Sequence, residues 1–379
     1  MKHWINVGQF KRSGTGDSMG ACQILSARSA ALDQAYMAAL VSSRIPVMLQ
    51  KLFAILIFVL SILCAWGWME YVDFMEKPLH LPAEGVRYNL ESGTTMRRLS
   101  AELAQQGLLE RPLFLRLLAR WNHQADQLKV GEYHIPEGTR PEGVLNILTS
   151  GKVVQYALTV VEGWTFKQMM AELNRHEAIK QTLTELPDGE IMRRIGHPEQ
   201  HPEGRFYPDT YHFPRGTTDV AFLKRAYRQM EKVLAREWEA KDSGLPLKST
   251  YECLILASIV ERETGLPSER PLIAGVFIRR LQKGMRLQTD PTVIYGMGDN
   301  YDGNIRRRDL KTDTPYNTYV HAGLTPTPIA MPSGEAIHAA LHPAAGKALY
   351  FVATGDGGHY FSATLEEHNK AVRKYQLKR

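Results

Sequence analysis

The chain has 379 residues, which is enough for two or three domains, and its overall composition is that of a globular protein. Its formal charge is +6 and its sequence pI is about 9.0, a mild basic excess that suits an anionic polymer as a partner. No basic cluster interleaved with aromatic residues is visible, so the sequence argues against nucleic-acid binding.

An uncharged apolar run from Leu52 to Met69 is the first clear element, and it is about as long as the hydrocarbon core of a bilayer. Trp66 and Trp68 lie at its far end, where interfacial aromatic residues are common. We predict a transmembrane helix at residues 47–70 that is retained as an anchor. A cleaved signal peptide is the alternative, but the run is long for one and no small-x-small cleavage site follows it.

Charges on either side of this run predict its orientation. Arg44 and Lys51 precede it, whereas Glu70, Asp73 and Glu76 follow it. Because basic residues favour the cytoplasmic side, we expect a cytoplasmic N-terminus and an exported C-terminal part.

Residues 1–46 show no core pattern and are predicted to be a disordered cytoplasmic tail. A start codon placed too early is the alternative, with Met37 or Met48 as the true start.

The three cysteines fall in different predicted compartments: Cys22 in the cytoplasm, Cys64 in the membrane and Cys253 on the exported side. An intramolecular disulfide is therefore not expected. No Cys/His cluster with zinc spacing is recognised, so the sequence indicates neither a metal nor another cofactor.

A small α/β unit is predicted at residues 86–153. A strand is followed by a helix that begins after Thr95 and ends at Gly107, and by a second helix with Pro112 in its first turn. A strand at "KVGEYHI" and a third helix complete the unit. This order resembles the LysM-like module, which in other envelope proteins binds glycans that contain N-acetylglucosamine. A spacer between membrane and catalytic part is the alternative.

Residues 155–379 are predicted to form one larger α+β domain. The pattern gives a strand feeding a helix, two helices at 219–241 and 249–264, a Pro- and Gly-rich region at 289–332, and a terminal strand, turn, strand and helix. The predicted fold class is therefore α+β: a membrane-anchored chain with a small LysM-like α/β module followed by a larger α+β catalytic domain.

The helix at 249–264 carries an acidic residue at the end of an apolar stripe. Ser258 and Glu261 share one helix face, so the Glu261 carboxyl is expected to be half-buried. Burial disfavours a charged carboxylate, which suits a general acid. A structural ion pair with a nearby arginine is the alternative, and Glu263 is predicted to face water.

Aromatic and polar residues cluster in three further stretches, as in sugar-binding grooves. The candidate substrate-binding residues are Glu203 and Asp209 in "EGRFYPDTYHF", Gln288, Asp290 and Tyr295 in "MRLQTDPTVIYGMG", and Tyr316 and Asn317 in "DTPYNTYVHAG". Each also has a plain structural explanation, since prolines fix turns in these loops and Asp290 precedes a helix that it could cap.

Five segments occur in a specific order: "ASIVERET", "GVFIRRLQKGMRLQTDPTVIYG", "TPYNTY", "GLTPTPIAMPS" and "YFVATGDGGHYFSATLEEHN". From about Val86 to the C-terminus the chain resembles the YceG-like family of endolytic murein transglycosylases. The resemblance implies cleavage of nascent peptidoglycan glycan strands outside the inner membrane, leaving 1,6-anhydro-N-acetylmuramic acid ends. The family's catalytic glutamate corresponds to Glu261. The family often has Asn-Pro where this chain has Met331 and Pro332, which puts local substrate contacts in doubt.

The resemblance also frames the expected site and partners. Glu261 would act as the single general acid/base, with Gln288, Asp290, Tyr316 and Asn317 stabilising the transition state, and no cofactor would be needed. Glycan strands are the expected partner, together with peptidoglycan synthases of the inner membrane. A hydrolytic muramidase with Asp290 or Asp209 as second carboxylate is one alternative. A non-catalytic glycan-binding scaffold anchored in the membrane is the other.

Overall fold

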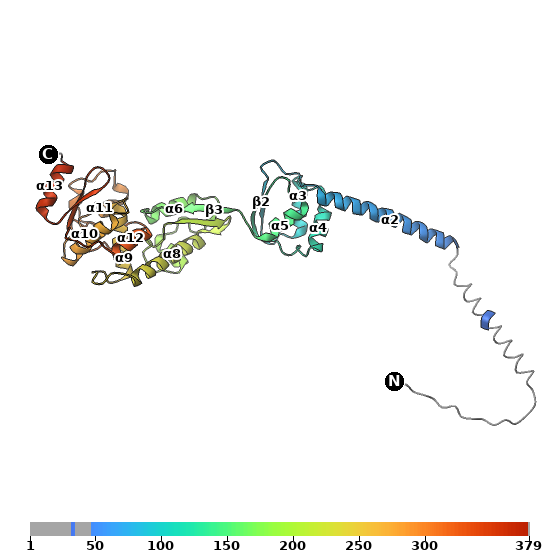
Figure 1. Ribbon diagram of the computed structural model, residues 1–379, viewed down its shortest axis with the longest axis horizontal. Helices are drawn as coiled ribbons and strands as arrows, with labels where there is room; N and C mark the ends of the chain where they lie inside the picture. Colours follow the sequence, from blue (N-terminus) through green and yellow to red (C-terminus); the bar gives the residue numbers. More distant parts are fainter. Residues whose placement is uncertain (1–31, 35–46, 378–379) are drawn as a thin grey trace, which may run out of the picture. The chain divides into compact units, whose positions relative to one another are not determined.

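The computed structural model describes residues 32–34 and 47–377. The chain divides into two compact units, Met1–Pro78 and Leu79–Arg379. The predicted disordered tail at 1–46 lies outside the described residues, apart from residues 32–34. Figure 1 shows the helices and strands of both units in chain order.

Helix α2 (Val47–Glu76) belongs to the first unit and continues beyond the predicted end at residue 70. Its large apolar side chains, from Leu49 to Met69, are exposed along its length. Within the described part of the chain it is the one helix long and apolar enough to cross a membrane, by length and composition. These properties fit a single-pass membrane anchor.

The second unit begins with a small α/β arrangement. Strands β1 (Val86–Leu90) and β2 (Gly131–Ile135) pair antiparallel, and helices α3 (Met96–Gln105) and α4 (Pro112–Trp121) lie between them in sequence. Helix α5 (Pro141–Ser150) follows β2. This is the element order on which the expected LysM-like module rests.

The core of this arrangement is built by the apolar faces of its helices and strands. The Thr95 side chain accepts a hydrogen bond from the Arg98 N–H and so begins α3, as predicted. The fully buried side chains include Leu99, Leu103, Leu115, Tyr133, Ile135, Leu145 and Leu148. Trp121, by contrast, is 85% exposed at the end of α4.

The next part is organised by short strands. Strand β3 (Gln155–Thr159) pairs antiparallel with β5 (Thr210–Pro214), and β4 (Ile179–Lys180) pairs parallel with β6 (Thr217–Thr218). Three amphipathic helices accompany these strands: α6 (Phe166–Arg175), α7 (Asp188–Ile195) and α8 (Asp219–Glu239). Their shared buried cluster includes Leu158, Phe166, Met169, Phe206, Phe213 and Phe222.

Helix α9 (Thr250–Glu263) lies at the centre of a second core. Every residue from Cys253 to Val260 is buried, because α8, α10 (Arg270–Gln282) and α12 (Gly334–Leu341) all pack against it. A helix covered on all sides must be apolar all round, which is what its sequence shows.

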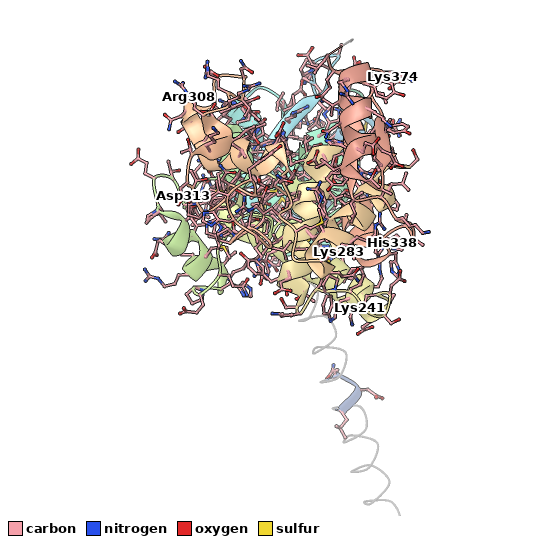
Figure 2. All side chains as sticks on the ribbon, turned by 90° about the vertical axis from the view of Figure 1, so that its left-hand side faces the viewer. Lys241, Lys283, Arg308, Asp313, His338 and Lys374 are labelled. Carbon is pink, nitrogen blue, oxygen red and sulfur yellow. The ribbon has the colours of Figure 1, made fainter. Side chains whose placement is uncertain are left out.

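The C-terminal part follows the predicted order. Helix α11 (Asp290–Met297) and two short 3-10 turns, Gly298–Asn300 and Asp309–Lys311, occupy the Pro- and Gly-rich region. Strands β7 (Tyr350–Ala353) and β8 (His359–Ser362) form the hairpin, and α13 (Leu365–Tyr375) follows. Figure 2 shows Lys374 of α13 projecting from the surface.

A shared carboxylate joins the two sides of the predicted domain boundary at residues 153–155. Glu132 of β2 accepts hydrogen bonds from the Arg215 guanidinium at 2.6 Å and the Tyr156 hydroxyl at 2.7 Å. Although burial works to raise it, these hydrogen bonds hold the pKa of Glu132 below its ordinary value. The small α/β arrangement is thus fixed to the following strands by a partly buried ion pair.

Candidate active site

The last residues of the "GLTPTPIAMPS" segment form a loop that passes α9. The Ile329 N–H donates to the Ser258 hydroxyl at 3.0 Å, which attaches the loop to the helix. On the other side, Met331 exchanges two backbone hydrogen bonds with the turn at Gly163 and Trp164. The loop is therefore held between α9 and that turn.

A glycine allows the same loop to approach the "EGRFYPDT" segment. Gly204 has a φ of +76°, and a Cβ atom there would lie 2.5 Å from the Cβ of Pro328. Any side chain at this position would meet both backbone strain and a clash.

The loop ends at Ser333, which meets the carboxylate of Glu261. Ser333 caps α12, since its hydroxyl oxygen accepts a hydrogen bond from the Ala336 N–H. Its N–H donates to Glu261 Oε2 at 2.9 Å, and its hydroxyl also donates to that oxygen. The N-terminus of a helix favours a negative charge at this point, so α12 itself helps to hold the carboxylate.

The second oxygen of Glu261 accepts a hydrogen bond from Arg270 Nη2 at 3.2 Å. Both side chains are only 6% exposed. The arginine partner that the sequence left as an alternative is therefore present.

Arg270 is shared among three carboxylates rather than paired with one. Glu162 lies 3.9 Å from the same Nη2 atom, and Glu335 contacts Nη1. Burial and the neighbouring charge of Glu261 raise the pKa of Glu162. With three carboxylates around one guanidinium, negative charge exceeds positive charge in this cluster.

Tyr207 lies beside the start of α12. The Gly334 N–H donates to its hydroxyl, and a Cβ atom on Gly334 would lie 2.8 Å from that oxygen. Tyr207 therefore places a phenol next to Gly334, the residue that follows Ser333.

A cleft of about 1110 Å³ opens beside this cluster. Arg262 and Ile329 line it, whereas Glu261 does not. Arg262 Nη1 donates to the carbonyl of Gly163 at 3.2 Å, and a Cβ atom on that glycine would be 4.0 Å from Glu261 Cγ. The cleft thus ends next to the residues that surround Glu261.

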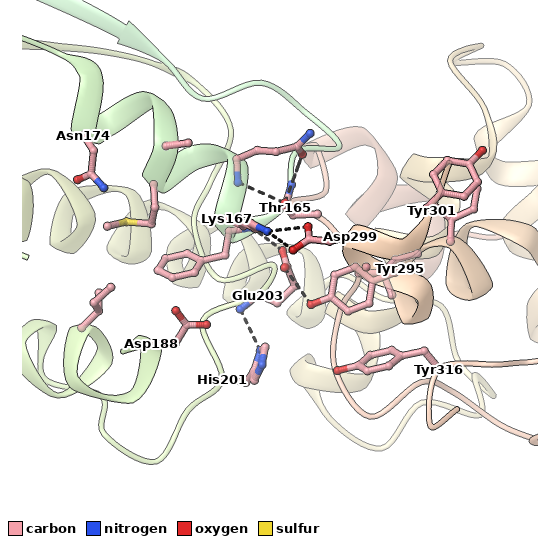
Figure 3. A pocket seen from close by; sticks show the side chains of 18 of the residues that line it. Thr165, Lys167, Asn174, Asp188, His201, Glu203, Tyr295, Asp299, Tyr301 and Tyr316 are labelled. Atoms are coloured by element: carbon pink, nitrogen blue, oxygen red, sulfur yellow. Dashed lines mark hydrogen bonds and ion pairs between the residues drawn. The ribbon is translucent and has the colours of Figure 1, made fainter. Parts of the chain in front are cut away.

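Glu203 is the most buried carboxyl group of the cleft, at 3% exposure. It accepts hydrogen bonds from the Phe166 N–H at 2.9 Å, at the start of α6, and from the Tyr295 hydroxyl at 3.0 Å (Figure 3). Burial raises its pKa to about 7, against the opposing effect of these hydrogen bonds. Glu203 therefore links α6 to α11 across the cleft.

Two predicted aromatic residues lie with Glu203. The rings of Tyr295 and Tyr316 are 4.8 Å apart at an interplanar angle of 63°, and both line the cleft (Figure 3). The Tyr316 hydroxyl shares a hydrogen bond with Thr327. Three of the seven expected substrate-binding residues are thus brought together in one cleft.

Gln288 and Asp290 form a separate group at the start of α11. Gln288 is exposed and has a φ of +49°, an unusual conformation for a residue other than glycine. Asp290 is the first residue of α11 and accepts a hydrogen bond from the Tyr319 hydroxyl at 2.6 Å. It makes no capping hydrogen bond to the helix backbone.

The prediction that Glu263 faces water is wrong. Its carboxylate accepts a hydrogen bond from the Thr289 hydroxyl. Burial, together with the nearby charge of Asp290, raises the pKa of Glu263 to about 7, although Thr289 works to lower it. The loop before α11 covers this side of α9, which the local helix pattern could not indicate.

The last two expected residues, Asn317 and Asp209, do not line the cleft. Asn317 is buried, and its amide donates to the carbonyls of Asp309 and Thr312 while its oxygen accepts from the Tyr319 N–H. These bonds fold its own loop. Asp209 is exposed just before β5 and accepts a hydrogen bond from the Thr210 N–H.

Sequence reasoning missed the groups that surround Glu261. Ser333 ends the "GLTPTPIAMPS" segment, and the Ser-Gly-Glu-Ala pattern marks it as a helix N-cap. Arg270 lies after the helix predicted at 249–264 and in none of the quoted segments. Glu162 lies just before a turn glycine. Nothing in the local pattern indicates that these three residues meet.

Comparison with known proteins identifies the family. The family model described as "YceG-like family" matches residues 88–374. The chain belongs to the YceG-like family. This confirms the resemblance stated from its motifs.

Two named relatives, from Bacillus subtilis and Streptococcus pneumoniae, support the same grouping. An "Endolytic murein transglycosylase" of Bacillus subtilis is 32% identical over 307 residues, covering 76% of this chain and 84% of that protein. A protein of the same name from Streptococcus pneumoniae is 26% identical over 353 residues, covering 83% of this chain but 63% of its own length. A yceG-like protein of Listeria monocytogenes, known from a crystal structure, is 28% identical, with a TM-score of 0.48 over 76% of this chain and 99% of that one.

We predict that Glu203→Gln flattens the pH dependence of stability. Since burial raises the pKa of Glu203 from 4.5 to about 7, its folded carboxyl retains a proton that the unfolded chain releases. Stability present below about pH 4.5 is thus lost as the pH rises toward 7, by about 3 kcal/mol at most. Denaturant unfolding of wild type and variant at pH 5 and pH 8 measures this. An equal decline in both proteins would contradict the assignment.

Proposed function

We propose that this chain is an endolytic peptidoglycan lytic transglycosylase, an enzyme of the lyase class. It cleaves nascent glycan strands between N-acetylmuramic acid and N-acetylglucosamine and leaves 1,6-anhydro-N-acetylmuramic acid ends. Glu261 is the single general acid/base. The observation that carries this proposal is a carboxyl group held by Arg270 and Ser333 at the end of a buried helix, beside a cleft, in a YceG-like protein.

The chemistry requires two proton transfers at one group. Glu261 in its protonated form gives a proton to the glycosidic oxygen as the bond to C1 of N-acetylmuramic acid breaks. As a carboxylate it then takes the proton of that sugar's C6 hydroxyl, whose oxygen forms the new bond to C1. The leaving strand gains one proton, the C6 hydroxyl loses one, and Glu261 ends as it began.

An intramolecular nucleophile explains why one carboxyl group suffices. Hydrolysis needs a second group to attack or to activate water. Here the attacking hydroxyl belongs to the substrate, and well-oriented intramolecular reactions reach effective molarities on the order of 10⁵ M or more. No cofactor enters this scheme.

The arrangement around Arg270 places two further carboxylates near Glu261. Glu162, Glu261 and Glu335 all contact this guanidinium, so three carboxylates share one positively charged partner. Exposed Glu335 and half-exposed Glu162 connect the enclosed Glu261 with solvent. A positively charged transition state at C1 is then stabilised by the remaining carboxylates.

Substrate contacts follow the two groups of predicted residues. Tyr295 and Tyr316 offer aromatic surface in the cleft, and the Tyr295 hydroxyl donates a hydrogen bond to Glu203. Gln288 and Asp290 are exposed and available to a longer strand. Asp209 is also exposed, whereas Asn317 acts by shaping its loop, because its amide is fully used there.

A hydrolytic muramidase is the second candidate, and one observation favours it. Glu162 lies on the same Arg270 nitrogen as Glu261, so a second carboxylate is present near the first. In the described part of the chain, Asp290 and Asp209 form hydrogen bonds with Tyr319 and Thr210 and none with this cluster, so they are poorer choices for that role. A glycan-binding scaffold without catalysis is the remaining alternative.

The apolar helix and the charges that flank it support a proposed location of the chain in the cell. The N-terminus is assigned to the cytoplasm and the catalytic part to the periplasm, with α2 crossing the inner membrane once. Glycan strands emerging from synthases would reach the cleft there, so synthases of the same membrane are the proposed protein partners. Copurification of a synthase with the full chain in detergent tests that contact.

We predict that Glu261→Gln abolishes cleavage while the protein stays folded. The amide keeps the volume and can still accept from Ser333, and Arg270 retains Glu162 and Glu335 as partners. Loss of both proton transfers should lower the rate by about 10² to 10⁴-fold or more. The assay is digestion of purified glycan strands by the full chain, with products analysed by mass, together with the thermal midpoint.

Two comparisons make this assay decisive. Glu239→Gln, at the exposed end of α8, is the control, and this variant should cleave glycan strands as wild type does. Glu263→Gln is not a suitable control, because the Glu263 carboxylate contacts the Thr289 hydroxyl. Anhydro ends weigh one water less than hydrolysed ends, so wild-type products that include that water would establish the muramidase. Near-wild-type release of anhydro ends by Glu261→Gln would remove Glu261 from the mechanism.

We propose that residues 86–153 bind glycan, and we predict that Trp121→Ala weakens retention on insoluble peptidoglycan. An exposed indole offers a face for stacking on a sugar, and its loss should reduce affinity by about two- to tenfold. Leu113→Ala, on the same helix and also exposed, is the matched control. Equal retention of all three full-length proteins would leave the module as a spacer.

The proposed orientation predicts the behaviour of a reporter fused after Arg379. A reporter that folds only outside the cytoplasm should be active there, because Arg44 and Lys51, which precede the apolar run at Leu52–Met69, favour a cytoplasmic N-terminus. Activity of a reporter that works only in the cytoplasm would reverse the topology.

A further inference from the structure

Three side chains of types that can bind metal ions come together away from Glu261, at the ends of two helices. Glu237 lies near the end of α8, and His338 and His342 lie four residues apart at the end of α12. One possible ligand atom from each falls within 4.8 Å of the others. The two imidazole rings are 4.3 Å apart, and Figure 2 shows His338 on the outside of the molecule.

Asp242 prepares His342 to act as a ligand. Its carboxylate lies 2.9 Å from His342 Nδ1 and can only accept, so this nitrogen carries the proton. In a neutral ring Nε2 then presents a lone pair. That atom is buried and has no hydrogen-bond partner among the residues that the structure describes. Carboxylates orient metal-binding histidines in this way.

Glu237 and His338 are already close enough to share a cation. Glu237 Oε2 lies 2.9 Å from His338 Nδ1, and the Glu237 side chain is 12% exposed. A metal ion would replace the proton between this carboxylate and the ring.

We propose that Glu237, His338 and His342 bind one divalent transition-metal ion of the zinc type. Two imidazoles with one carboxylate form a donor set that Zn²⁺ and its neighbours accept, whereas Mg²⁺ and Ca²⁺ prefer oxygen ligands. Three protein ligands leave a position for water. No local sequence pattern indicates this cluster, because Glu237 comes from a different helix, about a hundred residues earlier in the chain.

The position of the site indicates a structural role. The ion would join the end of α8 to the end of α12, and α12 begins at Ser333, which holds Glu261. None of its three ligands contacts the Glu261 cluster or lines the cleft. The ion is therefore a clamp on the scaffold and takes no part in bond cleavage.

Zinc binding to the full chain tests the proposal. The protein is purified in detergent with a tag free of histidine, stripped with a chelator and titrated with Zn²⁺ by calorimetry. We expect one saturable site per chain and a higher thermal midpoint when it is filled. Co²⁺ in its place should give the absorption bands of a nitrogen- and oxygen-ligated ion.

Variants assign the ligands. His338→Gln and His342→Gln should each weaken Zn²⁺ binding by at least about tenfold, and Asp242→Asn by a similar or smaller factor because it only orients His342. His321→Gln is the matched control, since His321 also contacts a carboxylate, Asp313, in a pair with no third ligand nearby in the described chain. It should bind Zn²⁺ as wild type does.

The opposite results overturn the proposal. These are no saturable binding by the wild-type chain, or unchanged affinity in both His338→Gln and His342→Gln with circular dichroism showing folded proteins. Loss of affinity in His321→Gln equal to that in His342→Gln would also overturn it, by showing nonspecific binding. Cleavage of glycan strands by the metal-free protein is measured in parallel, so this result and that of the proposed function stay separate.

Discussion

The hydrogen bonds from Ser333 to Glu261 join segments 72 residues apart, and the site depends on them. A carboxylate at the end of an apolar helix is costly unless donors meet it there. The loop before α12 provides these donors through a serine that also begins the next helix. The same loop is attached to α9 by Ser258 and to the Gly163 turn by backbone pairs, so the position of the carboxylate and the packing of three segments are set together.

Around Arg270, carboxylates outnumber positively charged groups. Arg270 is almost completely enclosed and faces three carboxylates, two of which reach solvent. Glu261 therefore shares its positively charged partner with Glu162 and Glu335. In the neighbouring cleft, burial raises the pKa of Glu203 to about 7. Its carboxyl group accepts hydrogen bonds from the Phe166 N–H of α6 and from the Tyr295 hydroxyl of α11.

Helix α12 links two different surfaces of the same scaffold. Its first turn positions Ser333 against Glu261, and its last turn carries His338 and His342 beside Glu237 of α8. Because both ends of a short helix are fixed by side chains from neighbouring helices, α12 has little freedom to shift. Rigid placement of the groups around a reacting bond is what general acid/base chemistry requires.

The sequence by itself determined those features whose physical cause is local. The uncharged run of α2, the capped apolar helix α9 and the terminal hairpin each follow from patterns within a few residues. It also singled out Glu261 as the candidate catalytic residue, through a family motif as well as its place on the helix. Its prediction for Glu263 was wrong, because Thr289 comes from a distant loop. Only the tertiary structure brought Arg270, Glu162 and Ser333 around Glu261. Such meetings depend on long-range packing, which no local periodicity of the chain encodes.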